Sequence, residues 1–238
     1  MDNAIYASLT RQSGLMREMR VVANNIANAS TTGFRREGVI FAEHLSALDR
    51  QGGTLSMADA RGRMLDLNQG VLTQTNNNLD LAIEGDGFFM VETPEGIRLT
   101  RAGAFMPGPE GELMNADGNR LLDEGQAPII LPAGASSVSI GADGTLSSNG
   151  LPFGRIGVFA APEGETPTQA GGTLFSVQGD PQPTEEPRIR QGFLEESNVD
   201  PIMEITRMIE VQRAYELGQS FLDREDQRIR SAITSMTR

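Results

Sequence analysis

Residues 201–238, PIMEITRMIEVQRAYELGQSFLDREDQRIRSAITSMTR, decide which fold we expect. Proline is absent after the first position, and Gly218 is the only glycine. The apolar residues follow a 3-4 heptad spacing, which predicts one long helix whose stripe another element must cover. Asn198 or Asp200 is expected to cap this helix, and Pro201 suits its first turn. The main row is Met208, Val211, Tyr215, Gly218, Leu222, Glu225, Ile229, Ala232 and Met236, and the neighbouring row is Ile202, Ile205 and Ile209.

The beginning of the chain has the same character. A row with spacings of four and three predicts a second helix, and the sequence Ser30-Thr31-Thr32-Gly33 is expected to end it. We interpret Gly33 either as the left-handed residue just past the helix end or as a hinge to the next domain. The row is Ile5, Leu9, Gln12, Met16, Met19, Ala23 and Ile26.

The residues between these two ends have a different composition. All but three of the 27 glycines and all but one of the 12 prolines lie there. Short apolar runs separated by turn-forming pairs such as Asp117-Gly118 and Asp143-Gly144 are typical of β-hairpins. Segment 161–187 is proline-rich and is expected to be loop-rich. The predicted strands are Leu79–Ile83, Phe88–Glu92, Ile97–Thr100, Leu113–Asn115, Ala127–Leu131, Ser137–Ile140 and Arg155–Phe159.

These patterns predict an α+β fold. Long N- and C-terminal helices would pair as a coiled-coil-like unit around an inserted, mainly-β central domain. We expect residues 1–34 and 195–238 to form a terminal helical domain and residues 35–194 to form a β-rich domain. Because an isolated helix pair is marginally stable in water, the termini are candidates for folding on assembly.

Composition excludes several classes of function. The net charge of −12 argues against nucleic acid or an anionic membrane surface as a partner, since both attract clustered basic residues. The chain has no cysteine, and its one histidine, His44, lies in FAEHLSAL (residues 41–48), which we expect to be a helix face. Neither Cys–His catalysis nor a multi-histidine metal site is therefore available. We expect no enzyme activity, no cofactor, no small-molecule substrate and no metal.

Membrane and secretion signals are also not expected. The first twenty residues hold no apolar run typical of a cleaved secretory signal. No stretch approaches the ~18 apolar residues of a membrane span, so the chain is not expected to be an integral membrane protein.

The chain resembles the flagellar rod and hook family in several stretches that occur in the family's order. The match begins with ANNIANASTTGF (23–34) and continues with NLDLAIEGDGFF (78–89) and LTRAG (99–103). It ends with SNVD (197–200) and MIEVQRAYE (208–216). The start Met1–Tyr6 and the turn Ala142–Thr145 are similar to the proximal-rod type of this family.

The resemblance implies a structural function. It implies export through the flagellar type III apparatus without a cleaved signal, and assembly with other rod proteins and with itself in the rod that crosses the periplasm. The terminal helices would form the inner wall and the β-domain the outer layer. The implied assembly residues are Ile5, Leu9, Met16, Met19, Asn24, Asn25, Ile26, Asn28, Gly33, Phe34, Asn198, Ile202, Ile205, Met208, Ile209, Val211, Gln212, Arg213, Tyr215, Leu222 and Ile229.

Several alternatives remain open at the sequence level. Some of the three asparagines at 24, 25 and 28 would fix helix register by hydrogen bonds, or they would simply end a solvated helix. Tyr215 would contact a neighbour or pack within its own chain. For the whole chain, the alternatives are a distal-rod or hook protein of the same family, or a secreted carbohydrate-binding or hydrolytic β-domain. A carbohydrate-binding domain usually needs aromatic side chains that stack on sugar rings, and this chain has no Trp and only two Tyr.

Overall fold

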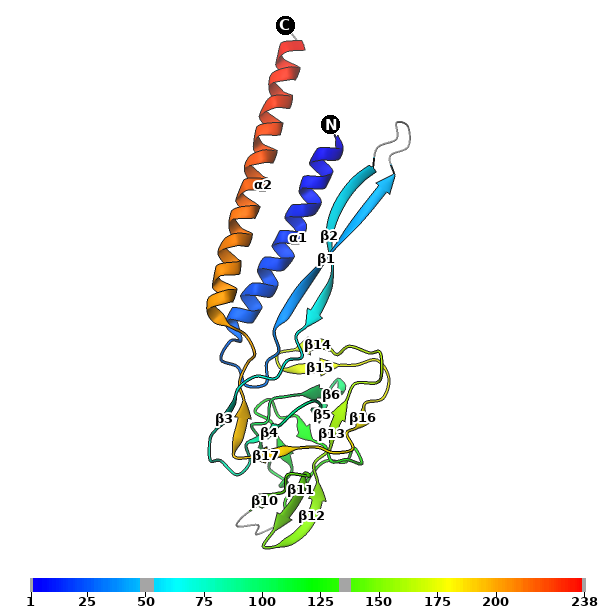
Figure 1. The fold of residues 1–238 in the computed structure, drawn as a ribbon, viewed down its shortest axis with the longest axis vertical. Coiled ribbons are helices and arrows are strands. Elements are labelled where there is room, and N and C mark those ends of the chain that lie inside the picture. Colours follow the sequence, from blue (N-terminus) through cyan, green and yellow to red (C-terminus); the bar gives the residue numbers. More distant parts are fainter. Residues whose placement is uncertain (1, 48–53, 133–137, 237–238) are drawn as a thin grey trace. The chain divides into compact units, whose positions relative to one another are not determined.

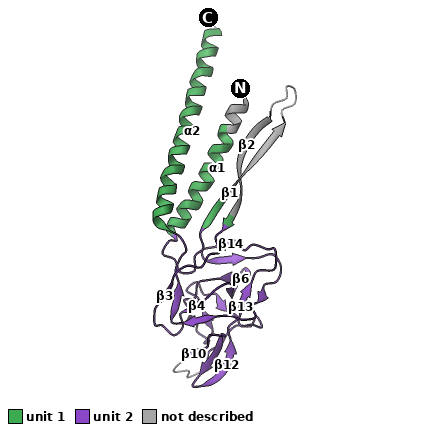
Figure 2. Ribbon diagram, in the orientation of Figure 1, with its two compact units in different colours: residues 1–27, 37–64, 200–238 green, residues 28–36, 65–199 purple. Residues whose placement is uncertain are grey.

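The computed structural model describes residues 2–47, 54–132 and 138–236, which form two compact units (Figure 2). Unit 1 comprises residues 1–27, 37–64 and 200–238, and unit 2 comprises residues 28–36 and 65–199. The chain therefore crosses between the units at four points. One helix lies near each end of the chain and the region between them is mainly β, so the predicted α+β class is confirmed.

Unit 1 contains both helices. Helix α1 (Asp2–Ala27) and helix α2 (Pro201–Met236) lie side by side and run antiparallel (Figure 1). Asp200 Oδ1 accepts hydrogen bonds from the backbone N–H groups of Ile202 (2.9 Å) and Met203 (3.1 Å). Asp200 is therefore the N-cap of α2, and Asn198, the other candidate, is not.

Two long strands complete unit 1. Strands β1 (Glu37–Ala47) and β2 (Thr54–Leu65) pair as a two-stranded sheet. The expectation that the segment around His44 is helical is wrong, because this segment lies in β1; the His44 side chain is outside the described residues. Pairing with a strand elsewhere in the chain overrides the local helix propensity of Ala, Glu and Leu. Residues 37–64 thus group with the helices and not with the β-rich unit, which differs from the boundary we expected at residue 35.

Unit 2 is built from short strands. Its largest sheet has the order β14-β15-β6-β5-β9-β8-β7, with β13 pairing both β5 and β16. Smaller sheets are β10-β11-β12, β17-β4 and β18-β3. Strands β17 and β18 come from the end of the unit and pair with β4 and β3 from its beginning, so the two ends of unit 2 are held together. The bounds are β3 Leu72–Gln74, β4 Leu81–Ile83, β5 Phe88–Thr93, β6 Gly96–Thr100, β7 Met106–Pro107, β8 Leu113–Met114, β9 Arg120–Leu121, β10 Val138–Ile140, β11 Thr145–Ser148, β12 Leu151–Arg155, β13 Val158–Ala160, β14 Thr168–Gly171, β15 Leu174–Ser176, β16 Gln182–Pro183, β17 Ile189–Gln191 and β18 Phe193–Glu195.

Most strand predictions are confirmed within a few residues, and two are wrong. Segment 127–131 makes isolated bridges through Pro128 and Ile130 and is not a continuous strand. Segment 155–159 is divided between the end of β12 and the beginning of β13. The segment 161–187, expected to be loop-rich, also supplies β14 and β15, which extend the sheet beyond β6.

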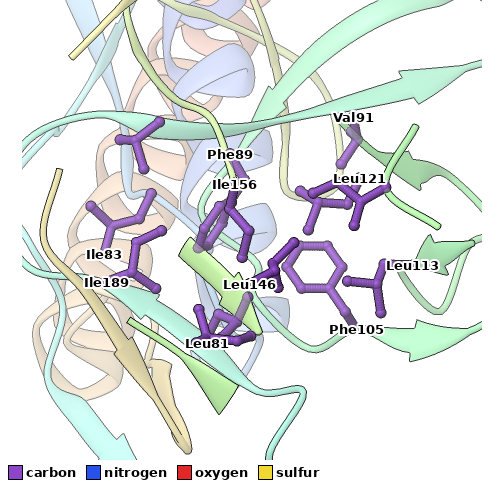
Figure 3. Close-up of a cluster of buried hydrophobic side chains, with 13 residues drawn as sticks. Leu81, Ile83, Phe89, Val91, Phe105, Leu113, Leu121, Leu146, Ile156 and Ile189 are labelled. Atoms are coloured by element: carbon purple, nitrogen blue, oxygen red, sulfur yellow. The ribbon is translucent and has the colours of Figure 1, made fainter. Parts of the chain in front are cut away.

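The core of unit 2 is made of aliphatic side chains and a few phenylalanines. The larger cluster, drawn in Figure 3, packs Phe89 edge-on to Phe105 at a ring separation of 5.6 Å. A second cluster surrounds Phe88, Phe159 and Phe175. Alternate residues of β5 enter the two clusters, Phe89 and Val91 one of them and Phe88 and Met90 the other, so β5 is covered on both faces.

Candidate assembly surfaces and the Glu195 cluster

A buried ion cluster centred on Glu195 lies in unit 2. Arg35 Nη1 is 2.6 Å from Glu195 Oε1, and Arg101 Nη1 is 3.1 Å from Glu195 Oε2. Glu195 Oε1 also accepts a hydrogen bond from Gly70 N at 3.0 Å, and Arg35 Nη1 donates to Asn68 O at 2.5 Å. All three charged side chains are at most 3% exposed. A single carboxylate thus connects three segments of the chain.

The cluster contains more positive than negative charge. Burial lowers the pKa of Arg35 and of Arg101, and attraction to Glu195 partly opposes this effect in both. Arg101 is held further by Gly85 O, which accepts from Nη2 at 2.6 Å, and by the ring of Phe88, whose centroid is 5.3 Å from Cζ. Glu195 is therefore the central counter-charge for two desolvated guanidinium groups.

Three of the stretches that carry the family resemblance, 23–34, 78–89 and 99–103, meet at this cluster. Arg101 belongs to the LTRAG stretch and binds the carbonyl of Gly85 in the EGDGFF stretch. Gly33, from the first stretch, donates its N–H to the carbonyl of Glu195 at 2.7 Å. Residues from these three stretches, far apart in sequence, are therefore joined by hydrogen bonds around Glu195 and Arg101.

Gly33 has the left-handed backbone that the sequence predicts, with φ of 73°. It lies well beyond Ala27, the last residue of α1, so it is not the C-cap of that helix. A Cβ at this position would lie 2.2 Å from the backbone N of Ala102. Glycine is therefore required by close backbone approach as well as by φ, and its interpretation as a hinge stays a prediction.

Asn198 is used inside unit 2. Its Oδ1 accepts from Arg36 N at 2.6 Å, and its Nδ2 donates to Asp66 O (3.0 Å) and Asn68 O (2.9 Å). Its backbone N–H donates to Phe34 O, and the Phe34 side chain is fully buried. These two residues, which the sequence assigned to the assembly interface, therefore hold together the segments that enter and leave unit 2.

In unit 1, the Asn25 side chain likewise joins separate segments of the chain by hydrogen bonds. Its Nδ2 donates to Glu37 O (2.8 Å) and to Glu204 Oε2 (3.1 Å), and its Oδ1 accepts from Glu37 N (3.0 Å). Asn25 and Glu204 are almost completely buried, so this side chain fixes the register of α1 against both β1 and α2. Asn24 and Asn28 are partly buried, and Asn28 Oδ1 accepts from the Thr31 hydroxyl at 3.2 Å. The hydrogen bonds of Asn25 therefore agree with the hypothesis that some of the asparagines fix helix register, and not with the alternative that they only end a solvated helix.

The face of α1 that is buried in unit 1 is not its apolar row. Gly14, Glu18, Val21, Val22 and Asn25 form the buried face. Glu18 is paired with Arg207, whose Nε donates to Glu18 Oε1 at 2.7 Å, and this hydrogen bond raises the pKa of Arg207. In the predicted row, Leu9 and Met16 are exposed, Met19 and Ile26 are partly buried, and the Ile5 side chain lies outside the described residues.

On α2 the predicted main row faces α1. Val211 is buried and Met208, Tyr215 and Leu222 are partly buried, whereas Gln212 and Arg213 are exposed. The neighbouring row of Ile202, Ile205 and Ile209 is exposed, although its members are all isoleucine. The Ile229 side chain is about one-third exposed, at 36%.

A third row on α2 is missing from the sequence prediction. Met203, Leu217 and Phe221 are exposed along another side of the helix. A helical projection that counts apolar residues away from the strongest row could have found them. Helix α2 therefore carries two uncovered apolar rows in addition to the one against α1, which is the feature expected of a helix with neighbours on more than one side.

Among the residues that the structure describes, no group of three or more His, Cys, Asp or Glu side chains could hold a metal ion. In that same part of the chain, no helix is long and apolar enough to cross a membrane.

Comparison with known proteins defines the class of this chain. The model described as "Flagella basal body rod protein" matches residues 5–35. The flagellar hook protein FlgE/F/G D1 domain matches residues 82–148, and the flagellar basal body rod FlgEFG protein C-terminal model matches residues 190–235. These three models cover nearly all of α1, of strands β4 to β11, β17 and β18 of unit 2, and of α2.

Individual relatives narrow the class. The chain is 40% identical to the flagellar basal-body rod protein FlgF of Caulobacter vibrioides, over 98% of this chain and 97% of the relative. It is 38% identical to FlgF of Mesorhizobium japonicum over 91% of this chain and 90% of the relative. FlgG of Bacillus subtilis is 29% identical over 98% of both chains. The chain therefore belongs to the flagellar basal-body rod protein family, and it is a structural subunit of the flagellar rod.

Proposed function

We propose that this chain is a proximal-rod subunit that assembles helically with other rod proteins through α1 and α2 and transmits torque from the motor to the hook. The terminal helices pair in a coiled-coil-like manner and form the inner part of the rod, and unit 2 forms its outer part. The chain is exported by the flagellar type III apparatus without a cleaved signal and functions where the rod crosses the periplasm. It is not an enzyme.

The two uncovered apolar rows of α2 carry this proposal. Each large apolar side chain that moves from water into a packed contact contributes ~1.5–3 kcal/mol, so a row of three supplies several kcal/mol of association free energy. Ile202, Ile205 and Ile209 form one such row, and Met203, Leu217 and Phe221 form the other. Exposed rows on two sides of one helix suit a lattice in which each subunit has several neighbours.

The experiment that tests the proposal is a deletion strain with quantitative mass spectrometry of purified hook–basal bodies. We expect the deletion to stop the axial structure before the hook, and the wild-type chain to restore it and to appear at a few copies per structure. Complete basal bodies in the deletion strain would refute the proposal.

A double variant tests whether the exposed isoleucine row of α2 is needed for incorporation into the rod. Replacing Ile205 and Ile209 by Asp should abolish incorporation, because two charges would be buried in an apolar contact. Gln219→Asp, at an exposed polar position of the same helix, is the matched control and should incorporate normally. Circular dichroism of both purified chains should show unchanged helix content, because all three positions are exposed in the monomer.

A distal-rod function is the second candidate, and the similarity to FlgG over nearly the whole chain is the observation that supports it. The two positions in the rod differ in which subunits are contacted. The stage at which assembly stops in the deletion strain separates the two positions. If this chain is a proximal-rod subunit, its deletion also prevents distal-rod subunits from being retained; if it is a distal-rod subunit, the proximal rod is still assembled.

A further inference from the structure

Three residues other than glycine have a left-handed backbone in the part of the chain that the structure describes. They are Asn76 (φ 60°), Gln126 (φ 64°) and Asn149 (φ 51°). This conformation is uncommon for residues with a side chain, and asparagine tolerates it better than most. Asn149 differs from the other two because a glycine follows it, and no other asparagine of the chain precedes a glycine.

Asn149 and Gly150 form the turn between strands β11 and β12 (Figure 1). Ser148 pairs with Leu151, which leaves two residues in the turn. Gly150 has φ of 80°, and positive φ at both residues is typical of the type I′ turn that Asn-Gly prefers. Both residues are exposed, and a Cβ added to Gly150 would meet no atom within 4 Å. The turn is therefore open to water.

We propose that Asn149 is a site of spontaneous deamidation. The backbone nitrogen of Gly150 attacks the side-chain carbonyl carbon of Asn149 and forms a succinimide ring. The bond from this carbon to the side-chain nitrogen breaks, and ammonia leaves with the proton that the Gly150 nitrogen gives up. Water then opens the ring at one of its two carbonyl carbons, which gives aspartate or isoaspartate. The reaction needs water and no other reagent.

The residue that follows the asparagine controls this reaction. Glycine has no Cβ beside the attacking nitrogen and adopts a wide range of backbone conformations, so it hinders ring closure least. Asn76 is exposed and left-handed like Asn149, but Asn77 follows it, and the Asn77 side chain hinders the attack. Gln126 would have to form a larger ring, which closes more slowly. Among the left-handed residues, the chemistry therefore favours Asn149.

Two Asp-Gly turns of unit 2 are poorer sites for the same ring closure. An ionised carboxylate is a weaker electrophile than a side-chain amide. The glycine N–H groups of these turns also donate to carbonyl oxygens, Gly118 to Asn115 O at 3.0 Å and Gly144 to Gly141 O at 2.9 Å. Attack by either nitrogen would break such a hydrogen bond.

The two products of deamidation affect the hairpin differently. Aspartate leaves the main chain unchanged and Asp-Gly suits the same type of turn, so this product only adds a negative charge to unit 2. Isoaspartate places an extra carbon atom in the main chain, which does not fit a two-residue turn between paired strands. Strand β12 lies at the edge of the sheet β10-β11-β12 with β11 as its neighbour, so its register depends on this hairpin. Isoaspartate should therefore loosen β12.

Peptide mapping of the purified full-length chain tests the proposal. The chain is kept for several weeks at physiological pH and temperature, and mass spectrometry measures the replacement of each side-chain NH2 by OH. We expect deamidation at Asn149 to be several-fold faster than at Asn76, which is the internal control. The variant Gly150→Asn gives both sites the same following residue and keeps a residue that tolerates positive φ. In this variant we expect the rate at Asn149 to fall to that at Asn76.

Equal or slower deamidation at Asn149 than at Asn76 in the wild type overturns the proposal, and so does an unchanged rate at Asn149 in Gly150→Asn. Hydrogen exchange of the separated products tests the effect on the hairpin. Amides of β12 should exchange faster in the isoaspartate form than in the aspartate form, and equal exchange overturns this part. Deamidation of Asn149 does not depend on the rod function, because every measurement uses the isolated chain.

Discussion

Removing the negative charge of Glu195 should destabilise unit 2 strongly. In Glu195→Gln, Arg35 and Arg101 stay buried without their shared negative charge. The amide oxygen can still accept hydrogen bonds at one of the two carboxylate positions, but the NH2 group at the other position faces a guanidinium group and cannot accept from it. Removing one partner of a buried ion pair costs ~3–5 kcal/mol, because the remaining charge is left uncompensated. Two guanidinium groups depend on Glu195, so we expect the loss in unfolding free energy to lie at the upper end of this range.

The assay must follow unit 2 alone. Far-UV circular dichroism is dominated by α1 and α2, which belong to unit 1, and the chain has no Trp to report on the β-strands. Hydrogen exchange of peptides from β5 and β6 reports the opening free energy of the unit 2 core directly. We expect exchange there to accelerate by more than a hundredfold in Glu195→Gln, since ~1.4 kcal/mol corresponds to a factor of ten.

Glu84→Gln is the matched control. Glu84 pairs with Arg190 at 3.5 Å, and both side chains are about half exposed, so the change should cost less than ~1 kcal/mol. If exchange in Glu195→Gln stays within a factor of about five of the wild type, the cluster does not stabilise unit 2 as we argue.

Four further perturbations follow from the same geometry. Gly33→Val should prevent folding of unit 2 or cost more than ~3 kcal/mol, because its side chain would overlap Ala102; protease resistance of unit 2 measures this. Asn25→Ala should cost ~2–4 kcal/mol by leaving buried polar groups unsatisfied, seen as a lower thermal midpoint at 222 nm. Asp200→Ala should cost ~1 kcal/mol at the start of α2, seen as faster amide exchange in its first turn. The pKa of Asp143 is lowered because Thr145 donates hydrogen bonds to its carboxylate from the hydroxyl and the backbone N–H. The stabilising effect of the ionised carboxylate is therefore present above the pKa of the unfolded chain and is lost as the pH falls through the pKa of the folded chain. NMR titration of Asp143 should find a lowered pKa, and a normal value would contradict this reasoning.

The two helices could be predicted because their signals are local. The apolar spacing of both helices, the Asp200-Pro201 start of α2 and the absence of proline from the first segment are all local signals, and both helices are present. Strand β1 could not be predicted, because its residues favour a helix locally and its partner strand begins at Thr54. Non-local pairing decides such segments, and a single sequence does not contain that information in readable form.

The side of α1 that is buried could not be predicted for a different reason. Hydrophobicity selects the row containing Leu9 and Met16, but the covered face holds Gly14, Glu18 and Asn25. Two of these are polar and are tolerated because each has a buried or partly buried partner. Their side-chain partners on α2, Glu204 and Arg207, lie more than 170 residues away in the chain, so the sequence gives no sign that the polar face is the inner one.

Only some of the residues in and around the Glu195 cluster could be singled out from the sequence. The stretches around Gly33, Arg101 and Asn198 were singled out through the family pattern, but Arg35 and Glu195 were not. Nothing local distinguishes a glutamate that will be buried between two arginines from one at the surface, since the surroundings come from three separate segments.

The placement of polar and apolar groups in unit 1 suits a subunit whose strongest contacts are with neighbours. Inside the unit, Asn25, Glu204 and the Glu18–Arg207 pair fix one register but add little net free energy, because each polar group also gives up water. Outside, the row Ile202, Ile205 and Ile209 and the exposed side chains of Ile229, Ile233 and Met236 are apolar and gain most when covered. Contacts between copies should therefore stabilise α2 more than its contact with α1 does. Amide exchange in residues 229–236 should accordingly be fast in the isolated chain and slow by orders of magnitude in basal bodies, whereas exchange around Val211 should change little. Similar exchange of residues 229–236 in both states would mean that no partner covers them.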